Sequence, residues 1–186
     1  ATPVLQGLTM PILNQVQPEP ARLHRKPGQT LKLDGLTPVL QGTLANSADW
    51  QTVPLPAPAT GRYLTLEALN SYSNDAFASL AELYVQDADG HDLPRAAWKV
   101  VYADSEEMAS EDGSADNVFD LQSTTYWHTR WSGDKPPPHP HQLVIDLGRD
   151  VTISGLRFLQ RPGATTIPAR IKDFRIFLTP TLPPGL

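Results

Sequence analysis

The stretch TTYWHTRWSG, residues 124–133, concentrates side chains that could bind a ligand or do chemistry. Two tryptophans, a tyrosine, a histidine and an arginine lie within six residues, in a chain that is only 8% aromatic. Side chains alternate between faces along an extended segment, so Trp127 should face one way and His128 and Arg130 the other. Trp127 is therefore expected in the core. His128 is expected at a loop surface, with Trp131 beyond it, where both could contact a ligand.

Composition excludes several classes of function. A net charge of −5 without a basic stripe argues against nucleic-acid binding. The absence of cysteine excludes disulfides, thiol catalysis and cysteine-ligated zinc. No apolar run approaches the roughly 20 residues of a membrane helix, so we expect no membrane insertion.

Catalytic motifs are also missing from the sequence. It contains no Gly-x-Ser-x-Gly, no phosphate-binding loop and no His-Glu-x-x-His. Glu106, Glu107 and Glu111 form a carboxylate cluster, and a glycosidase needs two carboxylates. Because the three lie on one segment, we interpret them as solvated acids. The chain is therefore predicted not to be an enzyme in its own right.

The elements that position these residues are predicted to be strands. The chain holds 19 prolines and 12 glycines, which interrupt helices and favour turns. Residues 114–121 alone suggest a helical turn, capped by Ser114. Gly155 is expected at a β-bulge. Strands are predicted at 30–35, 37–44, 61–69, 79–85, 98–103, 141–148, 151–159 and 170–178. This spacing is typical of a β-sandwich or barrel.

The first 36 residues are interpreted as an arm or linker with a possible extra strand. Residues 37–186 are interpreted as one domain. The hexapeptide TPVLQG occurs at 2–7 and again at 37–42. This is either a coincidence or a sign that one copy can replace the other in a sheet.

Four pieces carry a family resemblance, and their order and spacing make it specific. They are WKVVYADSEEMASEDGSADNVFDLQSTTYWHTRWSG (98–133), PHPHQLVIDLG (138–148), ISGLRFLQRPG (153–163) and RIKDFRIFL (170–178). They resemble the coagulation factor V/VIII type C, or discoidin, domain, and most closely its family 32 carbohydrate-binding modules. The resemblance implies an all-β jelly-roll sandwich of the galactose-binding-domain-like kind.

The first half of the chain resembles the end of such a domain. Residues 38–85 match its last third, which here precedes its first two thirds. A single circularly permuted domain uses every strand once, and the termini of compact domains often lie close enough to be joined. Residues 86–97 would then connect the former ends, and residues 176–178 would lie close to 38–42.

The resemblance also implies a structural calcium ion. Calcium takes six to eight hard oxygen ligands. The family's usual Asp-Gly is Asp120-Leu121 here, so the turn lacks its glycine. The matching ligands are Glu82, Asp120, Thr125 and the backbone near Asn117 and Gln122.

A sugar site at the loops is implied in the same way. By position, its residues would be His128, Arg161, Glu111 and Trp131, with Asn74 and Phe77 as a further amide and aromatic. Two alternatives stay open: Arg161 could pair with a carboxylate, and Trp131 could pack under 136–140. Gln160 replaces the family's usual proline. The histidines of HPHQ, 139–142, could bind zinc with His128, but their spacing is poor for shared coordination.

The function implied is a non-catalytic carbohydrate-binding module for galactose-type or related glycans. It would target an attached or associated glycoside hydrolase in a secreted or periplasmic bacterial protein, and the sequence shows no signal peptide. The alternative is a discoidin-type interaction module or spacer that binds no sugar.

Overall fold

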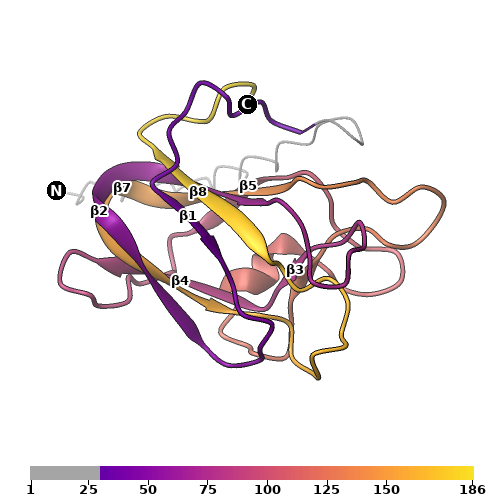
Figure 1. Ribbon diagram of the computed structural model, residues 1–186. Helices are drawn as coiled ribbons and strands as arrows, with labels where there is room; N and C mark the ends of the chain where they lie inside the picture. The colour runs from indigo at the N-terminus through magenta and orange to yellow at the C-terminus, as the bar shows by residue number, and fades with distance from the viewer. Residues whose placement is uncertain (1–29) are drawn as a thin grey trace, which may run out of the picture.

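The computed structural model describes residues 30–186, and it is almost entirely β-structure (Figure 1). The elements are β1 Leu40–Thr43, β2 Gln51–Ala68, β3 Ser79–Leu80, β4 Glu82–Asp87, β5 Lys99–Ala103, the 3-10 helix η1 Ala115–Phe119, β6 Trp127–His128, β7 His141–Leu159 and β8 Asp173–Thr179. All the strand pairs are antiparallel. The predicted all-β sandwich is confirmed.

Two long strands, β2 and β7, build both layers of the sandwich. The first part of β7 pairs with β5 and with the second part of β2, where Leu64 lies opposite Ile145. The second part of β7 pairs with β4 and with the first part of β2, where Val53 lies opposite Leu156. Both strands curve strongly in Figure 1, so each passes from one layer to the other.

Irregular positions mark these bends. Three prolines lie in the first part of β2, whose outer edge pairs with no other named strand, and the register shifts between Pro54 and Ala59. Proline cannot donate to a ladder and is tolerated at such edges. The bulge predicted at Gly155 is confirmed: Gly155 and Ile153 pair with consecutive β4 residues, Gln86 and Asp87. A Cβ at Gly155 would lie 3.1 Å from the Val53 carbonyl.

The core occupies the space between the layers. Leu64, Leu66 and Ala68 alternate along β2 and face it, and none is exposed to solvent. The opposite face of this sheet is also covered. Leu31 and Leu33 pack there in a second apolar cluster, whose other buried members are Tyr102, Val144 and Phe177.

The strand predicted at 30–35 is absent, and the reason is a side chain. Gln142 accepts a hydrogen bond from Leu31 N at 2.6 Å and donates one to Leu31 O at 2.9 Å. The amide therefore takes the place of a neighbouring strand. Residues 1–29, including the first TPVLQG, lie outside the described residues.

Most of the other predicted elements are present. Ser114 caps η1 as expected, and the strands predicted at 141–148 and 151–159 are one strand, β7. The predicted closeness of 176–178 to 38–42 is observed, because Leu40 pairs with Ile176 and Val39 N donates to Ile176 O at 2.8 Å. A circular permutation would bring these two segments together, but the permutation itself stays a prediction. No helix in residues 30–186 is long and apolar enough to cross a membrane.

Candidate functional site

One cavity brings together side chains that are far apart in sequence. It has a volume of about 280 Å³. Five of its six lining residues are among the predicted sugar ligands. The lining residues are Phe77, Glu111, His128, Trp131, Arg161 and Pro168. Asn74, the sixth predicted ligand, is not one of them.

His128 is buried, with 2% exposure, so the expected projection to the loop surface is wrong. Its ring lies on β6 and meets the Phe77 ring at a centroid distance of 6.0 Å. The Nδ1 atom lies 2.7 Å from the Thr129 carbonyl, which only accepts, so Nδ1 carries the proton. Burial lowers the pKa of His128, so the ring is neutral at pH 7. Its Nε2 atom is then an acceptor.

Glu111 connects two aromatic side chains at the cavity. Its Oε1 accepts from Trp131 Nε1 at 2.8 Å, and its Oε2 accepts from the Tyr126 hydroxyl at 3.2 Å. The Arg161 guanidinium lies 4.8 Å from the centre of the Tyr126 ring. Trp131 is 41% exposed and so presents part of its ring to solvent. Tyr126 was missed as a site residue, although its i, i+2 spacing to His128 could have indicated it.

The loop that carries Phe77 is held by a neighbouring carboxylate. Asp75 accepts from Ser71 Oγ at 2.9 Å, from Ser73 Oγ and from Phe77 N at 2.9 Å. Burial alone would raise the pKa of Asp75, but these hydrogen bonds together lower it. Asn74 stands on the outside of this loop, with a φ of 52°.

Glu107 is the centre of the neighbouring loops, and its interpretation as a solvated acid is wrong. It has 0% exposure. Its carboxylate accepts from five donors: the backbone N–H groups of Ala109, Ser110, Trp131 and Ser132, and the Ser132 hydroxyl, at 2.7–3.0 Å. Burial opposes ionisation, but hydrogen bonds from Ser132, Ser110 and Trp131 outweigh it and lower the pKa of Glu107 to about 2.

A buried arginine shapes the loop that carries Arg161. Arg170 donates twice to the Arg161 carbonyl, at 2.8 and 3.0 Å, and once to the Gly163 carbonyl at 2.6 Å. Gly163 has a φ of 126°, and a Cβ there would lie 2.1 Å from Ile167. Gln160, the departure from the family pattern, is buried and bonds Ile171 N and O.

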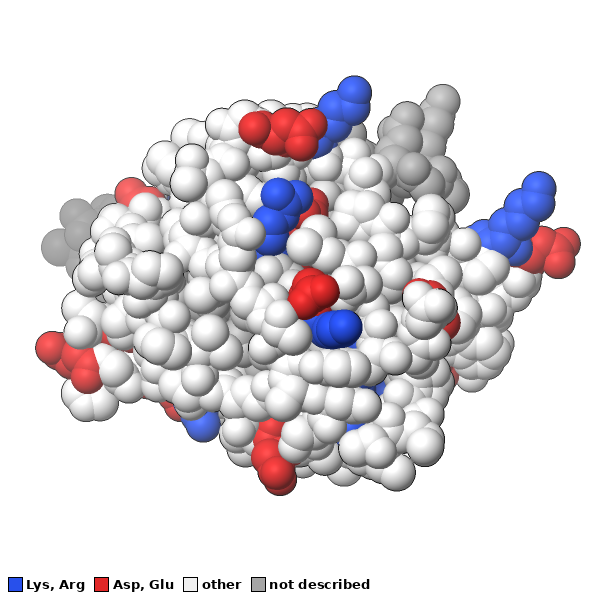
Figure 2. All heavy atoms as spheres, viewed as in Figure 1, with Lys and Arg blue, Asp and Glu red and all other residues white. Residues whose placement is uncertain are grey.

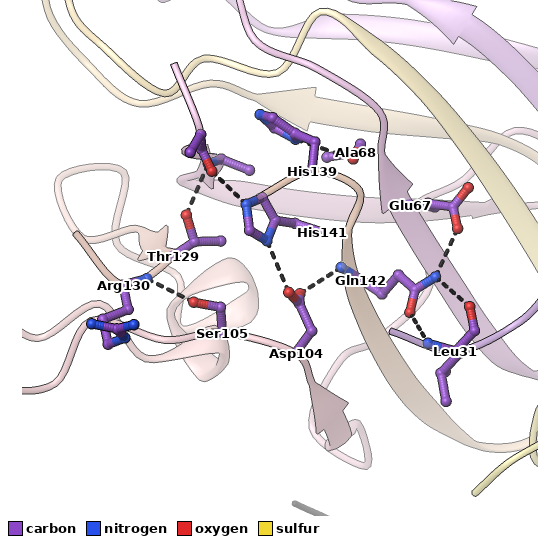
Figure 3. Close-up of polar contacts among 12 residues, drawn as sticks. Leu31, Glu67, Ala68, Asp104, Ser105, Thr129, Arg130, His139, His141 and Gln142 are labelled. Carbon is purple, nitrogen blue, oxygen red and sulfur yellow. Dashed lines mark hydrogen bonds and ion pairs between the residues drawn. The ribbon is translucent and has the colours of Figure 1, made fainter. Parts of the chain in front are cut away.

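A buried histidine connects three segments (Figure 3). His141 Nδ1 lies 2.8 Å from Asp104 Oδ2, and its Nε2 lies 2.6 Å from the Ala76 carbonyl. The next residue along from Asp104, Ser105, accepts from Arg130 N at 2.8 Å. With both nitrogens of His141 used in this way, the zinc interpretation of HPHQ loses a ligand.

Comparisons with known proteins identify the family of part of the chain. A model of the F5/8 type C domain matches residues 101–180, which carry Glu111, His128, Trp131 and Arg161. This segment belongs to the F5/8 type C (discoidin) family. A sialidase from Micromonospora viridifaciens is 34% identical to the chain over 127 residues. The match covers 68% of this chain and 18% of the sialidase, so the chain spans less than a fifth of that relative.

The second predicted site, for a metal ion, has oxygen atoms that converge. Gln122 N donates to Glu82 Oε1 at 3.1 Å and to Asp120 Oδ1 at 2.8 Å. The Thr125 hydroxyl contacts Asp120 Oδ2 and lies 3.1 Å from the Gln122 carbonyl. Two carboxylates, a hydroxyl and a carbonyl are ligands that calcium prefers, so these residues fit the ion. The Asn117 amide donates elsewhere, to the Asp112 and Tyr126 carbonyls.

The carboxylate pair of Glu82 and Asp120 also creates a negative environment that would favour a cation. Glu82 is 2% exposed. Burial, together with the nearby Asp120, raises the pKa of Glu82 to about 7 in the absence of any ion, although Arg95 opposes the rise. Leu121, where the family usually has glycine, adopts a φ of 66° and is 76% exposed. The turn therefore keeps the left-handed backbone without glycine, at some steric cost.

Surface charge on the described residues is mixed. On the face drawn in Figure 2, Lys and Arg lie singly, several of them beside Asp or Glu, among many uncharged residues. This face shows no basic stripe of the kind that binds a nucleic-acid backbone.

Proposed function

We propose that this discoidin domain is a carbohydrate-binding module whose sugar site is the cavity lined by Phe77, Glu111, His128, Trp131 and Arg161. The observation that carries the proposal is this gathering of an exposed indole, a carboxylate, a guanidinium and a neutral imidazole around about 280 Å³. These groups suit a terminal sugar, because it presents hydroxyls at its edges and C–H groups on one face.

Each group has a distinct part in the proposed binding. The indole of Trp131 packs against the C–H face of the sugar. Arg161 donates to hydroxyls and Glu111 accepts from them, and such charge-assisted hydrogen bonds are stronger than neutral ones. His128 Nε2 accepts from one hydroxyl, because its Nδ1 proton is held by Thr129. The proposed ligands are galactose-type or related terminal sugars.

The proposed role is binding without catalysis. Glycoside hydrolysis generally uses two carboxylates on either side of the scissile bond, and the residues that line this cavity include one, Glu111. The related sialidase supports the proposal that the domain targets a glycoside hydrolase, attached or associated, in an exported bacterial protein. Asn74, on the outer side of the Phe77 loop, would contact a second residue of a longer glycan.

Calorimetry with a panel of sugars tests the proposal. Calcium-loaded protein is titrated with galactose, N-acetylgalactosamine, fucose and N-acetylglucosamine. We expect millimolar or tighter binding to at least one. Arg161→Ala and His128→Ala should each weaken it at least about tenfold, since each removes hydrogen bonds worth about 1.5 kcal/mol or more.

The matched control is Arg149→Ala, which removes an exposed arginine outside this cavity and should leave the affinity unchanged. Unchanged binding in Arg161→Ala and His128→Ala would contradict the proposed site. No binding to any sugar, or to a glycan array, would favour a discoidin-type protein-interaction module or spacer.

We further propose that Glu82, Asp120, Thr125 and the backbone carbonyls near Gln122 and Asn117 hold a structural calcium ion. Its role would be to neutralise the two carboxylates and fix the loop between η1 and β6. Titration of EDTA-treated protein with Ca²⁺ should show one site, and Asp120→Asn should weaken it at least about tenfold, because a carboxylate ligand is lost. Asp134→Asn, an exposed loop position, is the control. A wild-type protein without calcium binding would contradict the proposal.

A further inference from the structure

Arg95 contacts the proposed calcium site from the segment that joins β4 to β5. Its side chain is 4% exposed. Its Nη1 donates to Glu82 Oε2 at 2.5 Å, to the Leu83 carbonyl at 3.0 Å and to the Val118 carbonyl at 3.3 Å. The guanidinium also lies over the Tyr84 ring, 3.6 Å from its centre. Arg95 therefore joins the β4–β5 segment to β4 and to η1.

Glu82 is shared between two partners, one for each oxygen. Oε2 faces Arg95, whereas Oε1 faces Gln122 N, which also binds Asp120. The Arg95 charge therefore acts on the same carboxylate that would bind a metal ion. When both Glu82 and Asp120 are ionised, one positive charge here reduces their combined charge from −2 to −1.

Burying the Arg95 side chain costs free energy, so its positive charge must offset that cost by an interaction inside the protein. Its Nε and Nη2 atoms are buried and have no hydrogen-bond partner. Burying unpaired N–H groups is unfavourable, and a charged group is worse unless an opposite charge offsets it. Glu82 supplies that charge at 2.5 Å.

We propose that Arg95 is a built-in counter-cation of the Glu82–Asp120 pair. Its positive charge holds the η1–β6 loop in place when no divalent ion is bound. The same charge lowers the affinity of this site for calcium. The second part of this proposal rests on the proposed calcium site. With Arg95 present, a bound Ca²⁺ leaves the cluster with a charge of +1. Without Arg95, Ca²⁺ and the two carboxylates balance.

The test compares wild type with Arg95→Met, which keeps a long apolar side chain, and with Arg95→Lys, which keeps the charge. Thermal melts are run in EDTA and in excess calcium, and calcium affinity is measured by calorimetry. In EDTA, the melting temperature of Arg95→Met should fall by about 5 °C or more. Calcium should restore most of this loss and should bind Arg95→Met at least tenfold more tightly than wild type. Arg95→Lys should bind calcium with near wild-type affinity.

A calcium affinity that is equal or weaker in Arg95→Met would overturn the second part of the proposal. The double variant Glu82→Gln/Arg95→Met tests the first part without calcium. If Arg95 neutralises Glu82, this double variant should melt higher in EDTA than Arg95→Met alone. If the fall in melting temperature of the double variant equals the sum of the falls in the two single variants, the counter-cation role is wrong. If no variant binds calcium, the calcium site itself fails, and the comparison in EDTA still decides the role of Arg95.

Discussion

Replacement of Glu107 by glutamine should lower the free energy of unfolding by about 3 kcal/mol and weaken sugar binding at least about tenfold. The carboxylate accepts from five donors, and an amide nitrogen would face some of those N–H groups with a donor of its own. The loops that carry Glu111 and Trp131 would then separate. Urea unfolding and sugar calorimetry measure the two effects.

Asp134→Asn is the matched control for Glu107→Gln, because it makes the same chemical change at an exposed position of the 130–135 loop. A second check is pH. The pKa of Glu107 in the folded protein, about 2, is below its ordinary value of 4.5, so its contribution is present above pH 4.5 and disappears as the pH falls toward 2. The stability difference between wild type and Glu107→Gln should therefore shrink over that range. A constant difference would contradict the assigned role.

Arg170→Met should cost about 3 kcal/mol of stability and should also weaken sugar binding at least about tenfold. The change leaves the Arg161 and Gly163 carbonyls and the Asn46 amide oxygen without their charged donor. Because these contacts fix the turn that presents Arg161, its guanidinium would lose its position over Tyr126. Amide hydrogen exchange should show faster opening of residues 161–168 than in wild type.

Arg149→Met controls for the loss of an arginine without the loss of a buried contact. Arg170→Lys keeps the charge but lacks the planar fork that reaches two carbonyls, so its stability and affinity should be intermediate. If a folded Arg170→Met protein keeps wild-type sugar affinity and wild-type amide exchange at residues 161–168, the turn does not depend on Arg170.

Sequence reasoning came close to the site because the chemistry sits in short motifs. Through the family resemblance, TYWHTRW and QRPG singled out His128, Trp131 and Arg161, and these three residues line one cavity. Their role as sugar ligands stays a prediction. The strand predicted at 61–69 is part of β2, where Leu64 and Leu66 face the core because alternate side chains of a strand share a face. The strand was inferred from neighbours in sequence, whereas the set of cavity residues came from the family resemblance.

The errors concern groups whose environment comes from distant segments. Glu107 looked like a solvated acid, but donors 24 and 25 residues away bury it. His128 looked like a surface residue, yet packing leaves it 2% exposed. The strand predicted at 30–35 does not form, because Gln142, 111 residues away, binds the Leu31 backbone.

By itself, the sequence determined the fold class, the order of most strands and most of the residues that meet at the cavity. Periodicity and motif spacing are local properties of the chain, so they can be read without a structure. The cavity residues followed from the family resemblance that those motifs carry. Only the tertiary structure decided which polar groups are buried, and beside which partners. Burial and hydrogen bonding depend on segments brought together by folding, so the positions of Glu107, Arg170 and Arg95 became visible only there.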